Sequence, residues 1–239
     1  ATGDTQRPLY IITLSGVLNV ILNLIFVIVF KLGVAGVALA TIISQYLSAI
    51  LIVLCLMLSK GSTKLELKKL SIDKRVLKEL LRIGIPSGLQ GTIFSLSNIV
   101  LQSAINSFGS ATMAGSAAAA NFEGFVYTAM NAFYHSSMTF TGQNAGAGNY
   151  KRVKKSFFIN LAYVTATGLI LGNTAILFSR QLLSVYTSDP AAISEGMIRM
   201  LYVCSAYFLC GTMEVAVGCI RGLGYSVVPM VTSLIGACG

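Results

Sequence analysis

Long apolar segments follow one another along this chain, separated by shorter polar connections. Six complete segments cover residues 9–30, 34–58, 83–108, 111–140, 157–178 and 197–220, and a seventh begins near residue 227. Each complete segment has roughly the 20 to 30 residues that an α-helix needs to cross a hydrocarbon layer of about 30 Å. The pattern predicts an all-α integral membrane protein, a polytopic bundle of transmembrane helices.

Composition and charge agree with this prediction. The chain is 55% hydrophobic and only 10% charged, with a mean hydropathy of +0.77, whereas soluble domains carry about 25% charged residues. It begins at Ala1 without an initiator methionine and stops at Gly239 within the seventh apolar segment. We therefore expect a fragment of a longer protein, in which the membrane helices themselves direct insertion.

Basic residues are concentrated on one side of the predicted bundle. Of the 17 Lys and Arg residues, 14 fall before, between or after the apolar segments at alternate ends, and only Lys31, Arg180 and Arg199 remain for the opposite side. Because cytoplasmic loops are enriched in Lys and Arg, residues 59–82 and 142–156 should be cytoplasmic in a multi-pass protein of the plasma (inner) membrane. The same bias accounts for the net charge of +9 without a nucleic-acid partner.

The segment 59–82 is the one substantial polar stretch. Within it, the apolar residues Val76, Leu77, Leu80 and Leu81 recur at helical spacing among basic residues, which predicts an amphipathic helix on the cytoplasmic membrane surface. This linker would separate residues 1–58 from residues 83–239.

Two acidic residues lie inside apolar segments, Glu123 in 111–140 and Glu214 in 197–220. A charge at the bilayer centre costs about 2.5 to 3.5 kcal/mol on insertion scales, so such residues are candidates for function. A carboxyl group in a low-dielectric site can exchange a proton or hold a sodium ion, and either would couple transport to an ion gradient. The alternative is a structural carboxylate that is hydrogen-bonded to a neighbouring helix.

Uncharged polar and aromatic residues continue along the same helical faces. Asn98, Gln102 and Asn106 are spaced four residues apart, and Tyr127, Asn131 and Tyr134 share a face with Glu123. Such a stripe faces either a neighbouring helix or a water-filled cavity, because lipid cannot satisfy its hydrogen bonds. If it is a cavity, nearby aromatic and methionine side chains would suit flat, cationic organic substrates: Phe94, Phe122, Phe125, Tyr127, Met130 and Tyr134.

Metal and enzyme chemistry have little support. His135 is the one histidine, and the five cysteines lie within apolar segments without CxxC spacing, so neither a metal site nor a bound cofactor is expected. A membrane-embedded enzyme would also need a nucleophile with its base, and one histidine without an HExxH motif offers none. We expect a protein that is not an enzyme.

Several short strings resemble motifs of the multidrug and toxic compound extrusion (MATE) family. Residues 142–148 read GQNAGAG and are followed by Lys151 and Arg152, residues 221–224 read RGLG with a proline five positions later, and residues 84–86 read GIP. Glycines permit tight turns, and Gln and Asn side chains can satisfy backbone groups there. We interpret the following motif residues as structural hinges or gates: Gln143, Asn144, Gly146, Arg221, Gly222, Gly224 and Pro229.

The resemblance implies twelve helices in two lobes, with this chain covering helix five to part of helix eleven. Residues 1–58 would be the last two helices of the N-terminal lobe and 83–239 most of the C-terminal lobe. It further implies a monomeric antiporter that exports small organic, often cationic, compounds in exchange for H⁺ or Na⁺. The acidic residue often found early in helix seven is missing between Pro86 and Asn98, which leaves the coupling ion open.

A lipid-linked saccharide flippase of related architecture is the nearest alternative. Such a protein should have a more cationic central cavity, and the sequence predicts no Lys or Arg deep within any span. A purely structural membrane scaffold would not need the two intramembrane acids.

Overall fold

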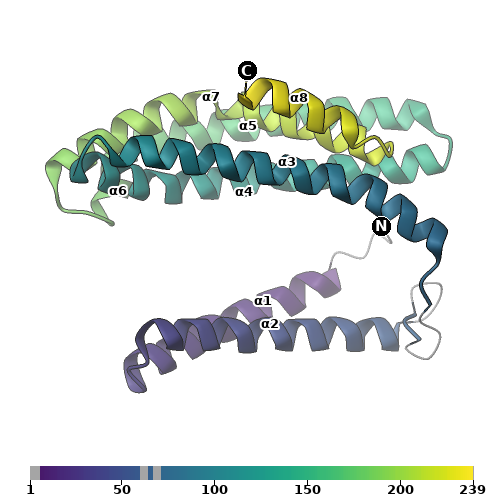
Figure 1. Ribbon diagram of the computed structural model, residues 1–239, viewed down its shortest axis with the longest axis horizontal. Helices are drawn as coiled ribbons and strands as arrows, with labels where there is room; N and C mark the ends of the chain where they lie inside the picture. Colours follow the sequence, from purple (N-terminus) through teal and green to yellow (C-terminus); the bar gives the residue numbers. More distant parts are fainter. Residues whose placement is uncertain (1–5, 60–63, 67–70, 239) are drawn as a thin grey trace. The chain divides into compact units, whose positions relative to one another are not determined.

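The computed structural model describes residues 6–59, 64–66 and 71–238, which contain α-helices and no strand. The all-α fold predicted from the sequence is confirmed. The chain divides into two compact units, Ala1–Ile72 and Asp73–Gly239, and each is described by itself (Figure 1).

The first unit is a helical hairpin. Helix α1 (Gln6–Leu24) continues into a π-helical turn (Ile25–Val29), and α2 (Gly33–Leu58) packs against α1. The two helices approach closely where small residues meet: the Ser15 hydroxyl donates to the Ser44 carbonyl at 2.7 Å. Most apolar side chains of this unit are exposed, as expected for helices that face lipid or further helices.

The second unit is built around α4 and α7. Helix α5 packs on both, while α8 contacts chiefly α3. Side chains that accept hydrogen bonds from backbone N–H groups begin three of these helices, since Asp73, Asn149 and Asp189 cap α3, α5 and α7. The helices of this unit are α3 (Lys74–Asn106), α4 (Ser110–Gly146), α5 (Tyr150–Leu177), α6 (Ser179–Ser184), α7 (Pro190–Gly222) and α8 (Val227–Cys238).

Small residues allow α4 and α7 to approach closely. A Cβ atom added at Gly218 would lie 2.6 Å from the Tyr134 carbonyl oxygen, and one added at Gly115 would collide with the Ala192 carbonyl. Because lipid chains are as apolar as a leucine side chain, membrane helices associate through such close packing rather than through hydrophobic burial. The α4–α7 contact therefore forms the rigid centre of this unit.

Replacement of Gly115 by alanine should destabilise the protein. The added methyl group would meet the Ala192 carbonyl and the Gly196 backbone nitrogen, and overpacking of this kind costs about 1 to 3 kcal/mol. We expect a lower thermal midpoint for the full-length protein in detergent. Gly124→Ala, on the same helix but with no atom within 4 Å of the added Cβ, is the matched control and should be neutral or slightly stabilising. A Gly115→Ala midpoint equal to that of wild type would contradict this account of the packing.

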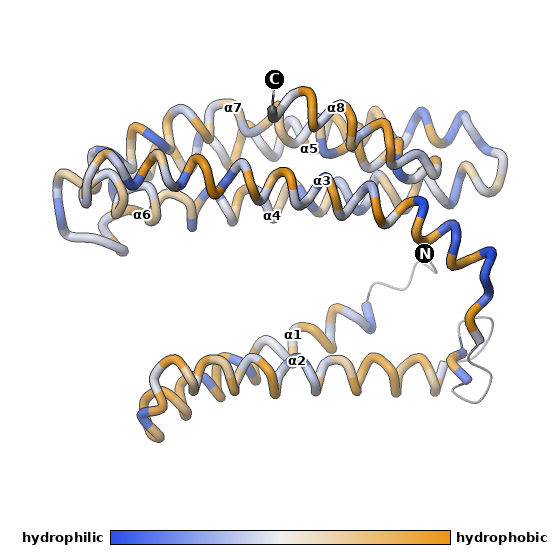
Figure 2. The backbone as a smooth tube through the Cα atoms, in the orientation of Figure 1, coloured by the Kyte–Doolittle hydropathy of each residue, from blue (hydrophilic) through white to orange (hydrophobic). Residues whose placement is uncertain are grey.

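The helices differ in how uniformly apolar they are. Among the described residues, four helical segments are long and apolar enough to cross a membrane: Gln6–Val29, Gly33–Leu58, Tyr150–Leu177 and Pro190–Gly222. Helices α3 and α4 have sufficient length but carry more polar residues, and several of those on α4, including Ser116, Ser137 and Thr141, are buried against neighbouring helices. Figure 2 shows α2 hydrophobic along most of its length, whereas α3 begins with hydrophilic residues and alternates thereafter.

The prediction of a separate amphipathic helix within residues 59–82 is revised. Val76 to Leu81 form the first turns of α3, which runs from Lys74 through Pro86 to Asn106 without a break. The helix begins before its apolar part because the Asp73 side chain accepts a hydrogen bond from the Arg75 backbone N–H at 2.8 Å. Residues 60–63 and 67–70 of the predicted linker lie outside the described residues.

Candidate functional site

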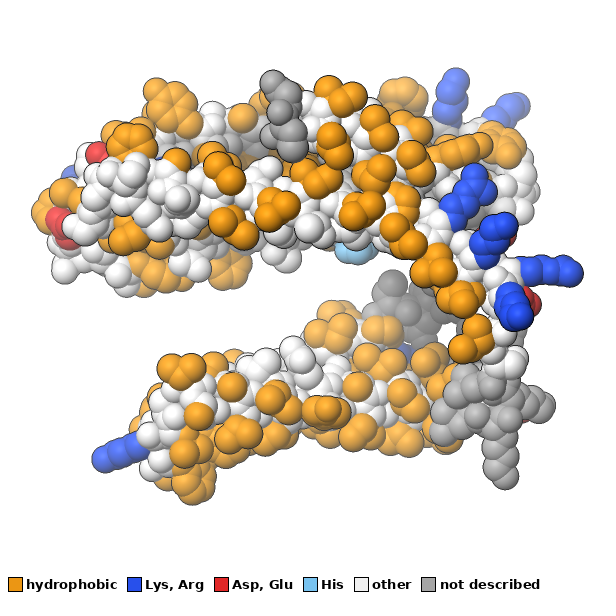
Figure 3. All heavy atoms as spheres, viewed as in Figure 1, with side chains coloured by type: hydrophobic (Ala, Val, Ile, Leu, Met, Phe, Trp, Pro, Cys, Tyr) orange, Lys and Arg blue, Asp and Glu red, His pale blue; other side chains and the backbone are white. Residues whose placement is uncertain are grey.

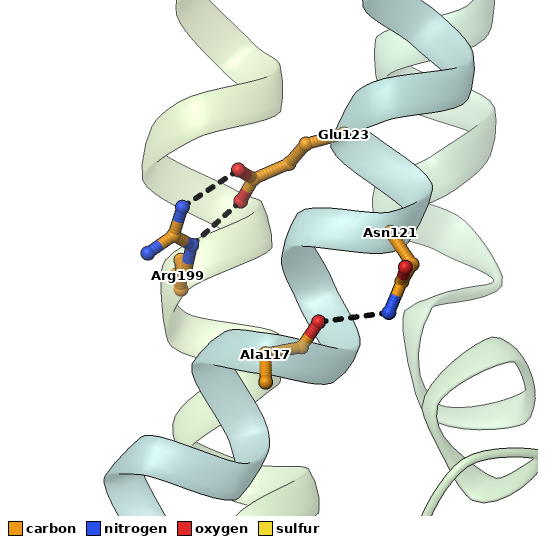
Figure 4. Close-up of polar contacts among 4 residues, drawn as sticks. All are labelled: Ala117, Asn121, Glu123 and Arg199. Carbon is orange, nitrogen blue, oxygen red and sulfur yellow. Dashed lines mark hydrogen bonds and ion pairs between the residues drawn. The ribbon is translucent and has the colours of Figure 1, made fainter. Parts of the chain in front are cut away.

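Glu123 forms an ion pair that the sequence did not predict. Its carboxylate oxygens Oε1 and Oε2 accept hydrogen bonds from Nε and Nη2 of Arg199, each at 2.8 Å. Figure 4 shows the two side chains pointing toward each other from α4 and α7. Only 7% of the Glu123 side chain and 28% of the Arg199 side chain are exposed, so this is a largely buried pair.

Arg199 was expected on the side of the membrane opposite the basic loops, near the end of the 197–220 segment. This expectation missed its role, because α7 begins at Pro190 and Arg199 therefore lies roughly 14 Å along the helix. The bidentate geometry compensates the Glu123 charge and joins α4 to α7, which leaves Glu123 less available to bind a free ion.

Glu214 has a different environment. It is half-buried on α7, and its Oε1 accepts a hydrogen bond from the Tyr127 hydroxyl of α4 at 3.2 Å. Asn131 lies about one turn further along α4. Neither His135 nor Arg221 makes an ion pair with the carboxylate among the described residues. Glu214 is thus a half-buried carboxylate on an apolar helix, with no ion-pair partner among the described residues.

The structure brings together only part of the predicted substrate cavity. Tyr127 lies beside Glu214, and Asn131 follows Tyr127 by about one turn on α4. Asn98, Gln102 and Asn106 are exposed on the second half of α3, where Gln102 donates to the Asn106 side-chain oxygen at 3.0 Å. Because α3 packs chiefly on α8, no described contact joins its polar stripe to the stripe of α4.

A cavity of about 380 Å³ lies among α3, α7 and α8. Glu214 does not line it, but its sequence neighbour Met213 does. Met213 and Val217 of α7 contribute to its lining, together with Phe94 of α3 and Ser233 of α8. Phe94 was predicted as a candidate for contact with substrate, whereas Met213 and Ser233 were not singled out. The cavity combines aromatic, thioether and hydroxyl groups, which suit a small organic ligand.

Arg221 connects four helices. Its Nη1 donates to the Tyr134 hydroxyl and its Nη2 to the Gln90 side-chain oxygen, both at 2.6 Å, and the guanidinium lies 5.7 Å from the centre of the Tyr134 ring. The Gln90 amide nitrogen in turn donates to the Ser233 hydroxyl at 2.6 Å. Tyr134 is buried, so the structure assigns it to this cluster and not to an open cavity wall. Sequence analysis did not identify Gln90.

The remaining motif residues lie at helix ends. Gly224 adopts a φ of 88° in the turn before α8, a conformation that favours glycine. Asn144 donates to the Phe140 carbonyl at 2.8 Å, and the Gln143 carbonyl accepts the Ala147 N–H at 3.1 Å, within the last turn of α4. The other three are also placed by the structure: Gly146 is the last residue of α4, Gly222 is the last of α7 and faces Met138 and Thr141, and Pro229 is buried in the first turn of α8.

Comparison with known proteins identifies similar transporters. The chain is 29% identical over 242 residues to a probable multidrug resistance protein, YpnP, of Bacillus subtilis (strain 168), covering 98% of this chain and 52% of the relative. It is 25% identical over 216 residues to an FAD transporter of Shewanella oneidensis, covering 87% of this chain and 47% of that protein. The chain thus spans about half the length of these curated relatives.

A solved structure shows the same fold. The crystal structure of a MATE protein in the straight conformation superposes with a TM-score of 0.89 at 19% identity, covering 98% of this chain and 53% of that one. The family model MatE matches residues 86–239. That family contains membrane transporters and not enzymes, as the sequence predicted. The chain belongs to the MatE family, that of the multidrug and toxic compound extrusion proteins.

Proposed function

We propose that the full-length protein is a secondary antiporter of the plasma membrane that exports small organic compounds in exchange for H⁺ or Na⁺. The observation that carries the proposal is Glu214, a half-buried carboxylate within α7 that accepts a hydrogen bond from Tyr127 and lacks an ion-pair partner among the described residues. Acids within membrane spans are rare and characteristically mark ion or substrate pathways.

Coupling requires that ion and substrate favour different states of the transporter. In our proposal a proton or sodium ion binds the Glu214 carboxylate and neutralises it, which weakens the binding of an organic cation nearby. Each ligand then shifts the equilibrium between inward-open and outward-open states in its own direction. Tyr127 orients the carboxylate by its hydrogen bond.

Glu123 has a secondary place in this proposal. Because Arg199 already engages both of its carboxylate oxygens, an ion can bind Glu123 only after this pair opens. We therefore assign the pair to holding α4 against α7, with Glu123 as a second coupling residue only in a state where Arg199 has moved away.

The substrate class follows from the side chains beside Glu214. The exposed ring of Tyr127 and the Phe94–Met213 cavity offer aromatic and polarisable surfaces, which favour flat organic molecules and, through cation–π contact, organic cations. Of the relatives, one is named a probable multidrug resistance protein and one an FAD transporter; FAD contains aromatic rings but is an anion, so these names leave the sign of the substrate's charge open.

The hydrogen-bond partners of Arg199 and Arg221 argue against a lipid-linked saccharide flippase. Arg199 is paired with Glu123, and Arg221 is bound by Tyr134 and Gln90. Neither of these two arginines is therefore free to bind a diphosphate in the part of the chain that the structure describes.

The test is ethidium efflux from vesicles that contain the full-length protein, under an imposed proton or sodium gradient. Wild type should export ethidium only when one of the gradients is present, and Glu214→Gln should lose at least about 90% of that gradient-driven efflux, because an amide neither releases a proton nor carries a charge for Na⁺. Glu195→Gln, at an exposed position on the same helix, is the control and should behave as wild type. Undiminished efflux in Glu214→Gln would remove Glu214 from the mechanism, and no efflux of ethidium or other organic cations by wild type would contradict the proposed substrate class.

A further inference from the structure

A second cavity, of about 630 Å³, lies between α4 and α5 and is separate from the site around Glu214. On α4 its lining includes Phe133, Phe140 and Asn144, and on α5 it includes Lys155 and Tyr163. None of these residues has a role in the proposed antiport. The cavity is therefore a candidate for a different ligand.

The two ends of this cavity differ in chemistry. The polar end lies where α4 ends and α5 begins, and it includes Asn144, Arg152 and Lys155. The apolar end includes Phe133 of α4 and Tyr163 of α5, which lie about three turns away from that connection. From Lys155 to Tyr163 the helix rises about 12 Å, close to the hydrocarbon depth of one leaflet, which is about 15 Å. The lining thus changes from cationic to apolar over the depth of a leaflet.

The cations at the polar end have no carboxylate partner. Neither Arg152 nor Lys155 makes an ion pair among the described residues. Figure 3 shows Lys and Arg side chains gathered at this end of the second unit. Two uncompensated cations beside hydrogen-bonding Asn144 and Ser156 favour a phosphate group, to which Arg and Lys bind by charge-assisted hydrogen bonds.

We propose that this cavity binds an anionic phospholipid from the surrounding leaflet, with its phosphate at Arg152 and Lys155 and an acyl chain along Phe133, Phe140 and Tyr163. A free anion would use only the polar end, and a neutral hydrocarbon only the apolar end. Basic pockets between membrane helices recognise anionic headgroups in this way, and α5 is apolar enough to border the bilayer.

The test uses the full-length protein in nanodiscs that contain equal amounts of phosphatidylglycerol and phosphatidylcholine, with retained lipids counted by native mass spectrometry. Arg152→Gln/Lys155→Gln should reduce phosphatidylglycerol retention about tenfold, since two charge-assisted contacts are lost. Lys151→Gln/Lys154→Gln removes the same charge from exposed neighbours that do not line the cavity, and should change retention about twofold or less. Thermal midpoints of both variants show whether they fold.

Three outcomes would overturn the proposal. Equal losses in the two double variants would mean general surface electrostatics. Equal retention of the two lipids by wild type would mean no headgroup recognition. Displacement of phosphatidylglycerol by millimolar inorganic phosphate, with no effect of Ile159→Ser in the apolar lining, would mean a site for small anions. The assay does not involve transport, so its result is independent of the proposed antiport.

Discussion

Replacement of Arg199 by methionine should destabilise the full-length protein by about 3 kcal/mol or more. Methionine keeps much of the aliphatic volume of arginine but removes the two donors to Glu123. The Glu123 carboxylate, of which only 7% is exposed, would then remain buried without a partner. A lower thermal midpoint in detergent, or a lower yield of folded protein, measures the effect.

The double variant Glu123→Gln/Arg199→Met separates the lost pair from the stranded charge. With both charges removed, most of the stability should return, because replacing a buried ion pair by neutral groups is often close to neutral. Glu123→Gln alone should cost less than Arg199→Met, since the Arg199 side chain is more exposed and can reach water. Equal stability of Arg199→Met and wild type would show that the pair does not hold α4 and α7 together.

Replacement of Arg221 by alanine should have the second large effect. It removes the donors to the Tyr134 hydroxyl and to the Gln90 side-chain oxygen, and hydrogen bonds to charged groups contribute about 1.5 to 3 kcal/mol each. We expect a loss of about 3 kcal/mol and faster hydrogen exchange in α8, because Gln90 also holds Ser233 of that helix.

Two conservative variants show which contacts of Arg221 matter. Tyr134→Phe removes one of the two bonds and should cause roughly half of the loss. Arg221→Lys keeps the charge but has no fork with which to reach both acceptors, so it should recover only part of the stability. Full recovery by lysine would indicate that charge alone, and not the bridging geometry, stabilises this end of the unit.

The sequence predicted where the long helices lie, but not the residues at which they begin and end. Each predicted apolar segment coincides with a helix of the structure, because the apolar length needed to cross a bilayer is long and unmistakable. The helices α3, α5 and α7 begin before those segments, since capping and amphipathic turns continue them into polar sequence. The short helix α6 was not predicted, because six residues carry too little periodic signal.

The site was only partly predictable, because its contacts join residues that are far apart in the sequence. Glu123 and Glu214 stood out because acids are rare in apolar segments. Their pairings were not predicted, since Arg199 is 76 positions away from Glu123, and Tyr127, which was singled out only for the face it shares with Glu123, is 87 positions from Glu214. Such pairs depend on how each helix is rotated about its axis, which no local pattern reports. The signal available was Arg199 itself, a basic residue within the apolar segment 197–220, which needs an acidic partner when it is buried.

The coupling role of Glu214 is tested most directly by the dependence of ethidium affinity on H⁺ and Na⁺ in the purified full-length protein. Antiport through Glu214 predicts that affinity falls as pH falls or as Na⁺ rises, and that Glu214→Gln loses this dependence. The chain's one histidine, His135, lies about two turns beyond Tyr127 on α4, so His135→Asn is the control and should keep the dependence. The same ion dependence in Glu214→Gln as in wild type would contradict the account.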